Sequence, residues 1–208
     1  MAPNFLIDGP DRAKHSILLA HGAGAPMDSQ SMSATARALA DAGFRVARFE
    51  FDYMASRRTS SSRKPPPRAE TLKPEYVAAI AALKARGPLI IGGKSMGGRV
   101  ASMIADEQHA AGLLCLGYPF HPVGKPTQLR TAHLAELKTP ALIVQGTRDP
   151  FGTQGEVATY KLSKAISILW LEDGDHDLRP RKAVSGFSMA DHLKTMAEAT
   201  AAWAAKIT

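Results

Sequence analysis

The sequence Pro88-Leu89-Ile90-Ile91-Gly92-Gly93-Lys94-Ser95-Met96-Gly97-Gly98 joins two kinds of pattern. The apolar run 88–92 is typical of a strand covered by helices on both faces, and the residues after Ser95, to about Gln108, predict a helix. A residue in so sharp a turn adopts strained backbone angles, and side chains two positions away on either side would collide with it. Glycines at 93 and 97 relieve this crowding and raise the Ser95 hydroxyl above the sheet. The alternative is a glycine-rich turn with an incidental serine.

Outward from this turn, short apolar runs alternate with amphipathic stretches, which predicts an α/β protein with a parallel sheet. We expect strands near residues 16–20, 44–51, 88–92, 112–117, 141–145 and 165–171, with a short edge strand at 5–7. Helices are expected at 29–42, where Gly43 provides the C-terminal glycine, and at 74–86, 96–108 and 183–206, with a short one closing at 160–163. The chain 1–208 is therefore interpreted as a single domain with a minimal, mostly parallel sheet of about six or seven strands and helices on both faces.

Three connections leave the carboxyl ends of the expected strands, at 52–70, 118–138 and 172–183. The first is polar, basic and rich in proline, which argues against a helix there. The second contains a short helical pattern near 132–137. None is long enough to form a large lid, so we expect a shallow or open pocket where the strand order reverses.

An acid and a histidine follow later strands in the order that serine chemistry requires. Asp149 lies in the turn Gly146-Thr147-Arg148-Asp149-Pro150 after the fifth strand, and His176 lies in Gly174-Asp175-His176-Asp177 after the sixth. A serine hydroxyl is a weak nucleophile unless a base removes its proton. We predict Ser95 as nucleophile, His176 as the base and Asp149 as the group that orients the imidazole.

Two stretches are candidates for an oxyanion hole. The helix after Ser95 directs its first amides at the reacting centre, which makes the Met96 N–H one donor. The turn His21-Gly22-Ala23-Gly24 offers the second, with Ala23 as the first choice and Gly24 as its neighbour. An ordinary glycine-rich turn is the alternative for this loop, and a phosphate-binding loop is disfavoured because neither the dinucleotide nor the Walker spacing is present.

Substrate contacts are less clearly indicated. Tyr118, Phe120 and His121 leave the fourth strand near the predicted site, where they either line an acyl pocket or anchor a proline-rich loop. The net charge of +7 is concentrated in a run without acids: Arg57, Arg58, Arg63, Lys64 and Arg68. This run is either a solvated loop or, with a second cluster, attracts an anionic substrate. The second cluster consists of Arg179, Arg181 and Lys182.

Other classes of partner are not expected. The basic run contains no aromatic residue for base stacking and matches no nucleic-acid module. The acids at 173, 175 and 177 should point away from His176; they lack calcium-loop spacing and a second histidine, so we expect no metal and no cofactor. No run approaches ~18 apolar residues and no secretory pattern is visible, so no membrane association and a cytoplasmic location are expected.

Cys115 lies among leucines and is interpreted as a buried, inert thiol. The oligomeric state is not indicated by the sequence.

These stretches together resemble the α/β-hydrolase superfamily over nearly the whole chain. The resemblance narrows to small bacterial hydrolases related to dienelactone hydrolase, a group that is also similar to the hydrolase-like domain of a chromatin-complex subunit and of a testis-expressed vertebrate protein. It rests on residues 21–26, 48–51, 92–99, 117–122 and 146–152. The resemblance implies the fold and the triad but no substrate. Dienelactone hydrolase itself uses a cysteine where this chain has Ser95, and the superfamily's first antiparallel strands are reduced here.

The function that this pattern predicts is a serine hydrolase that cleaves a small-molecule ester or thioester through an acyl-enzyme. A peptidase or acyltransferase with the same triad remains an alternative, as does a non-catalytic interaction domain that keeps the fold. A haloalkane dehalogenase is disfavoured because it needs a carboxylate in place of Ser95.

Overall fold

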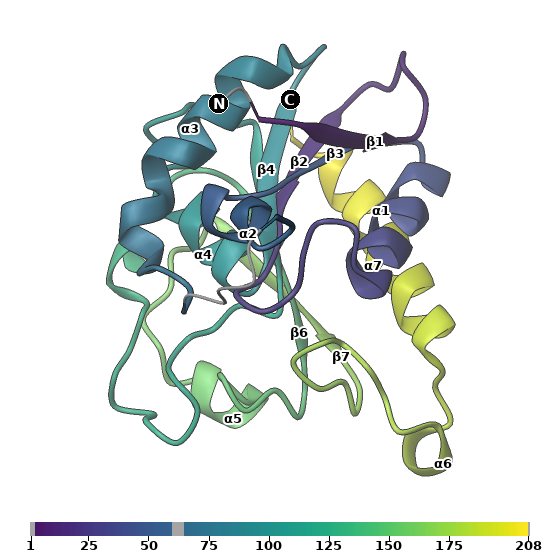
Figure 1. Cartoon of the computed structure of the whole chain (residues 1–208). Coiled ribbons are helices and arrows are strands. Elements are labelled where there is room, and N and C mark those ends of the chain that lie inside the picture. Colours follow the sequence, from purple (N-terminus) through teal and green to yellow (C-terminus); the bar gives the residue numbers. More distant parts are fainter. Residues whose placement is uncertain (1–2, 60–64, 208) are drawn as a thin grey trace.

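The computed structural model describes residues 3–59 and 65–207, which contain one sheet in the strand order β1-β3-β2-β4-β5-β6-β7 (Figure 1). β1 pairs antiparallel with β3, and all other neighbours in this sheet are parallel. The expected six parallel strands and the added edge strand are thus confirmed. Their bounds are β1 Phe5–Asp8, β2 Ser16–Ala20, β3 Arg45–Phe49, β4 Leu89–Lys94, β5 Gly112–Leu116, β6 Ala141–Gly146 and β7 Ile166–Leu171.

Helices cover both faces of this sheet, as the continuous apolar strands predict. The helices α1 and α7 lie against one face, and α3 and α4 lie against the other (Figure 1). Along β2, Ile17 and Leu19 pack in the core under α1 and α7, and Leu18 and Ala20 pack in the core under α3 and α4. Successive side chains of a strand point to opposite faces of the sheet. The helical bounds are α1 Gln30–Asp41, α2 Asp52–Ser56, α3 Lys73–Leu83, α4 Met96–Ser102, α5 Gln154–Val157, α6 Lys182–Ser185 and α7 Met189–Ala204, with 3₁₀ turns η1 Ala69–Leu72 and η2 Ala132–Ala135.

The ends of α1 follow the signals in its sequence. The Ser29 hydroxyl accepts a hydrogen bond from the Met32 N–H at the first turn. At the other end Gly43 adopts a φ of +93°, and its N–H donates to the Ala40 carbonyl at 2.9 Å. A left-handed glycine is the usual way to end a helix, so the prediction for this segment is confirmed.

Several predicted helix boundaries are wrong. Helix α3 ends near Lys84, which has a left-handed φ of 47°, and does not continue to Arg86. The regular part of α4 stops at Ser102, and only single turns follow. The expected helix at 183–206 is broken at Gly186 into α6 and α7, and the helix expected to close at 160–163 lies earlier, as α5. A reciprocal capping interaction between Thr153 and Glu156 starts α5 there.

The proline-rich segment also differs from the prediction. Residues 52–56 form α2, because the prolines of the segment come only at 65–67 and leave its first residues free to turn. Residues 60–64, which include Arg63 and Lys64, lie outside the described residues. In the part of the chain that the structure describes, no helix has the length and apolar character needed to cross a membrane.

The order of the strands reverses between β2 and β4, since β3 is added on one side of β2 and β4 on the other. Ligands bind at such switch points in open α/β sheets. Tyr76 of α3, which is fully buried, fixes the two strands here: its hydroxyl lies 2.8 Å from the Leu18 carbonyl and accepts the Gly92 N–H at 2.8 Å. Among the described connections that leave this edge before the next long helix or strand, only the short elements α2, α5, α6, η1 and η2 occur, so no large lid covers it.

Candidate active site

Ser95 occupies the sharp turn between β4 and α4 that the sequence predicts. Its backbone is strained, with φ 49° and ψ −113°, and its N–H donates to the Leu116 carbonyl at 2.9 Å. A Cβ atom at Gly93 would lie 2.3 Å from the Ala20 carbonyl oxygen, and one at Gly97 would lie 2.5 Å from the same atom. Both distances are far below van der Waals contact, so side chains at these two positions would collide as predicted, but the atom they would meet is a carbonyl oxygen of the neighbouring strand β2 and not Ser95 itself.

The structure brings Ser95, His176 and Asp149 together. The Ser95 Oγ lies 2.8 Å from His176 Nε2, and His176 Nδ1 lies 2.8 Å from Asp149 Oδ2. A carboxylate can only accept, so Nδ1 carries the hydrogen and Nε2 of the neutral ring accepts from the serine hydroxyl. The three side chains therefore form a continuous line along which a proton can leave Ser95.

Asp149 is fully buried and held by two further donors. The Gln145 side-chain amide donates to Asp149 Oδ2 at 2.9 Å, and the Phe151 N–H donates to Oδ1 at 2.9 Å. Gln145 is itself fixed, because its Oε1 accepts the Tyr118 N–H at 2.7 Å. The sequence analysis missed Gln145; the available signal is an amide at the end of the otherwise apolar strand β6.

Lys94 is a second residue that the sequence analysis missed. Its ammonium donates to the backbone carbonyl of His176 and lies 3.4 Å from Asp177 Oδ1. Burial lowers the pKa of Lys94, while Asp177 and Asp149 favour its charged form. Lys94, next to Ser95 in the sequence, thus holds the loop that carries His176.

The other acids of the histidine loop point elsewhere, as expected. Asp173 pairs with Arg181 and Arg148, and Asp175 accepts backbone N–H groups of its own loop. Within residues 3–59 and 65–207, no group of three His, Cys, Asp or Glu side chains is arranged to hold a metal ion. The Phe151 ring lies 4.2 Å from the His176 ring, centroid to centroid, and covers one face of it.

Two side chains, His21 and Tyr53, bind the backbone carbonyl groups of the turn after β2. His21, fully buried and with its pKa lowered by burial, donates from Nδ1 to the Gly22 carbonyl at 2.6 Å. The Tyr53 hydroxyl donates to the Ala23 carbonyl at 3.1 Å. In a trans peptide the N–H points away from the carbonyl, so the N–H groups of Ala23 and Gly24 are turned away from His21 and Tyr53. Met96, as the first residue of α4, has an N–H without a partner inside the helix.

The aromatic residues after β5 are buried in the protein. Tyr118, Phe120 and His121 are at most 2% exposed and line neither cavity beside Ser95. The Tyr118 hydroxyl donates to the Arg130 carbonyl at 3.0 Å, and His121 Nδ1 donates to the Pro122 carbonyl at 2.9 Å. Of the two interpretations of these residues, the structure favours the anchor for the loop over the lining of a pocket.

A second serine–histidine contact lies at the end of α4. The Ser102 Oγ is 2.8 Å from His133 Nε2, and it also donates to the Arg99 carbonyl at 2.7 Å. Ser102 is 3% exposed, and among the described residues no carboxylate makes a hydrogen bond to His133. This pair lacks the orienting acid and the access that Ser95 has.

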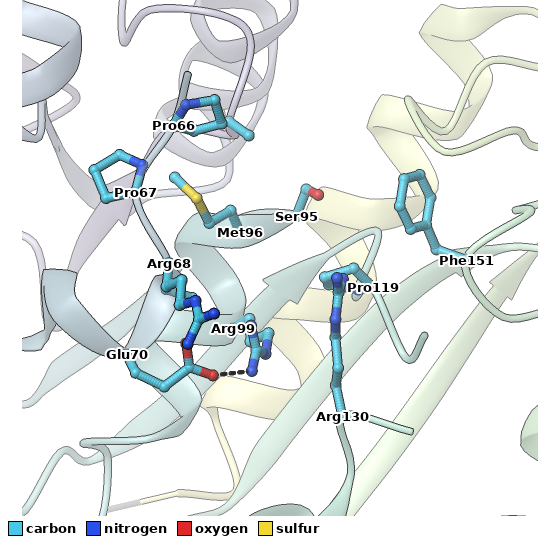
Figure 2. Close-up of a pocket in the computed structure, with 12 residues that line it drawn as sticks. Pro66, Pro67, Arg68, Glu70, Ser95, Met96, Arg99, Pro119, Arg130 and Phe151 are labelled. Carbon is cyan, nitrogen blue, oxygen red and sulfur yellow. Dashed lines mark hydrogen bonds and ion pairs between the residues drawn. The ribbon is translucent and has the colours of Figure 1, made fainter. Parts of the chain in front are cut away.

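Two cavities flank Ser95 and share Ala23, Ser95 and Phe151 in their walls. The arginine-side cavity, of about 340 Å³, is further lined by Arg68, Glu70, Arg99, Pro119 and Arg130 (Figure 2). The histidine-side cavity, of about 330 Å³, is further lined by Gly22, Gly24, Lys94, His176 and Asp177. A bound acyl compound can thus extend from Ser95 in two directions.

Solved structures show the same fold. A serine hydrolase without lid from Xanthomonas campestris superposes with a TM-score of 0.72 at 17% identity, covering 97% of this chain and 89% of its own. A dienelactone hydrolase from Anabaena variabilis gives a TM-score of 0.72 at 19% identity, covering 100% and 99%. At these identities the likeness establishes the fold alone, and it confirms the fold expected from the sequence.

Curated relatives are also similar in sequence. The "Putative protein-lysine deacylase ABHD14B" of Pongo abelii is 30% identical over 145 residues, which cover 69% of this chain and 66% of that protein. The Homo sapiens protein of the same name is 27% identical over 148 residues, or 70% and 67%. The chain thus spans about two thirds of the length of these relatives. A family model described as an alpha/beta hydrolase domain matches residues 13–205, so the chain belongs to the α/β-hydrolase family.

Proposed function

We propose that this protein is a serine hydrolase that cleaves a small ester or thioester through an acyl-enzyme on Ser95. The observation that carries the proposal is the unbroken line from Ser95 Oγ through His176 to Asp149, with both contacts at 2.8 Å. Family membership supports hydrolysis in general, and the choice of ester or thioester is part of the proposal.

The proposed reaction has two halves that use the same groups. His176 Nε2 takes the Ser95 proton as Oγ attacks the carbonyl carbon, and Asp149 stabilises the resulting imidazolium. The N–H groups of Met96 and Ala23 hold the oxyanion; one such donor contributes about 3 kcal/mol in characterised enzymes. His176 returns the proton to the leaving oxygen or sulfur, then activates the water that releases the acid from Ser95.

A second candidate is the cleavage of an acyl-lysine amide. It is favoured by the deacylase name of the curated relatives, and it needs the same steps with an amine as the leaving group. The rates of cleavage of an N-acetyl-lysine peptide, an acetate ester and an acetyl thioester separate these candidates. The same kind of substrate comparison is needed to recognise a peptidase or an acyltransferase that uses the same triad. Release of free lysine peptide at a rate comparable to ester cleavage would favour the amide.

Labelling with a fluorophosphonate probe tests the nucleophile. We expect wild-type protein to be labelled and Ser95→Ala to stay unlabelled, because the probe reacts only with an activated serine. Ser102→Ala is the matched control, since it removes a serine that also contacts a histidine, and it should be labelled like wild type. A folded wild-type protein that is not labelled overturns the proposal and favours a non-catalytic domain, whereas labelling that persists in Ser95→Ala overturns the assignment of Ser95 as the nucleophile.

A further inference from the structure

The arginine-side cavity holds more positive than negative charge. Arg68, Arg99 and Arg130 line it together with a single carboxylate, Glu70, which pairs with Arg99. Figure 2 shows Arg68, Glu70 and Arg99 close together, Arg130 apart from them beside Pro119, and the Ser95 hydroxyl above both. Among the described residues, Arg68 and Arg130 form no ion pair, and the buried Nε of Arg99 has no hydrogen-bond partner. One guanidinium of three is thus neutralised.

Three arginines elsewhere at this edge of the sheet form ion pairs. Arg58 binds Glu50 at 2.7 Å and Asp28 at 2.8 Å. Arg148 and Arg181 share the carboxylate of Asp173. Arg58 and Arg181, two of the basic residues that the sequence suggests for an anionic substrate, are therefore neutralised, whereas positive charge exceeds negative charge in the cavity beside Ser95.

Two groups in and behind this cavity have lowered pKa values, for which burial is the main cause and the charge of Arg99 the second. Burial lowers the pKa of Arg130, and the neighbouring Arg99 lowers it further. The pKa of His133 is lowered by burial and then by the same Arg99 charge. Like charges held together in a partly buried space favour the entry of an anion, which replaces repulsion with attraction.

The direction of the reaction assigns the two cavities. His176 must deliver its proton to the leaving atom, so the leaving group lies on the side of His176, in the histidine-side cavity. The carbonyl oxygen points to the N–H groups of Ala23 and Met96. The acyl chain then extends from the carbonyl carbon toward the remaining side, into the arginine-side cavity.

We propose that the arginine-side cavity is an acyl subsite for a short chain that ends in a carboxylate. The preferred substrates are then half-esters or half-thioesters of dicarboxylic acids. The bond from the carbonyl carbon to the leaving oxygen or sulfur breaks, the Ser95 proton passes through His176 to the leaving group, and water then releases the dicarboxylic acid. The inference rests on the proposed function and adds its substrate class.

Matched ester pairs test this preference. The 4-methylumbelliferyl half-esters of succinate, glutarate and adipate are compared with the butyrate, valerate and hexanoate esters, which have the same chain lengths and leaving group. We expect at least one half-ester to exceed its neutral partner about tenfold in kcat/KM, the effect of one charge-assisted hydrogen bond. This ratio should fall as salt is added, because salt screens partly exposed charges.

Variants of the cavity should move the ratio in opposite directions. Arg130→Gln and Arg99→Gln are expected to lower it about tenfold, through a loss on half-esters that exceeds any loss on neutral esters. Glu70→Gln should raise the ratio, because it removes the one anion that competes for Arg99. A folding defect cannot produce that increase. Arg58→Gln is the matched control outside the cavity and should leave the ratio unchanged.

The outcomes separate the two proposals. If the protein is labelled but cleaves half-esters and neutral esters at equal rates, the acyl subsite is overturned and the serine hydrolase stands. The same holds if none of the cavity variants changes the ratio of the two rates. Absence of both turnover and labelling overturns the proposed function. In that case calorimetry with glutarate decides on the anion site: binding that Arg130→Gln abolishes supports it, and no binding to wild type overturns it.

Discussion

The two cavities that share Ser95 treat their charged groups in different ways. In the histidine-side cavity, the Lys94 ammonium is matched by the Asp177 carboxylate and by the His176 carbonyl. In the arginine-side cavity, three guanidinium groups face one carboxylate. Moving a proton requires groups that are held in fixed positions, whereas selecting an anion requires charge that is left without a partner. Ser95, the proposed nucleophile, therefore lies between a cavity with fixed charges, called the fixed end, and one proposed to select anions, called the selective end.

This difference separates the expected effects of substitutions. Changes around His176 should slow all substrates by the same factor, because every acyl transfer uses that proton path. Changes among the arginines should alter the ranking of substrates. Substitutions of Asp149, Lys94 and Tyr53 leave the three arginines in place, so equal effects on charged and neutral acyl groups support the comparison and unequal effects contradict it.

The largest effect is expected from Asp149→Asn. An amide cannot hold the imidazole in the tautomer that accepts from Ser95, and the same change in a characterised triad lowers kcat about 10⁴-fold. Steady-state kcat on a matched pair of glutarate and valerate esters measures it. Asp11→Asn, which removes an exposed charge outside the site, is the control. A loss limited to one of the two esters would contradict a shared proton path.

A smaller loss is expected from Lys94→Met. Without the bond from its ammonium to the His176 carbonyl the histidine loop is free to shift, and small displacements in an active site cost up to about 10²-fold. Lys94→Arg should restore part of kcat, because it keeps a cation at this position.

The pH profile distinguishes this role from simple packing. Since burial lowers the pKa of Lys94 from its ordinary value of 10.5, the ammonium is lost at a lower pH than in a free lysine. The kcat of the wild type should then fall on the alkaline side below that value, and the fall should move to higher pH in Lys94→Arg. An alkaline limb that is the same in both proteins would contradict the proposed role of the hydrogen bond from Lys94 to the His176 carbonyl.

The smallest effect is expected from Tyr53→Phe. The change removes the hydroxyl that holds the Ala23 carbonyl at 3.1 Å and so loosens one candidate oxyanion donor. A single neutral hydrogen bond contributes about 1 kcal/mol, which corresponds to roughly a fivefold loss of kcat on both esters. Tyr160→Phe provides the control, because Tyr160 contacts Phe120 and lies outside both cavities.

The sequence predicts the fixed end of the site far better than the selective end. Gly93 and Gly97 have a local reason that any reader of the sequence can apply, and Asp149 and His176 follow strands in a known order. The bonding of Lys94 to a carbonyl of another loop has no such signal. Arg68, Arg99 and Arg130 come from three separate segments, and whether a guanidinium is neutralised depends on acids such as Glu50 that only the tertiary fold brings near.

The fold shows the same division. Strand positions follow from the apolar runs, since a buried strand has few other ways to satisfy its side chains. The end of α1 is predicted correctly from Gly43, whereas α3 ends at Lys84, where a lysine takes the left-handed conformation, before the glycine at 87 that the sequence suggests as its end. The break between α6 and α7 at Gly186, which has a φ of +80°, lies inside an alanine-rich stretch that predicts one continuous helix.

Cys115, the single cysteine of the chain, lies fully buried in β5 directly beneath the turn that carries Ser95. Its thiol lies 3.5 Å from the Gly98 carbonyl, and burial raises its pKa. A thiol reagent can reach it only after β5 and α4 have separated. The rate at which the Cys115 thiol is modified therefore measures how often the region beneath Ser95 opens. A variant that loses activity without a faster modification rate has kept its structure there, whereas a faster rate shows that the structure itself is loosened.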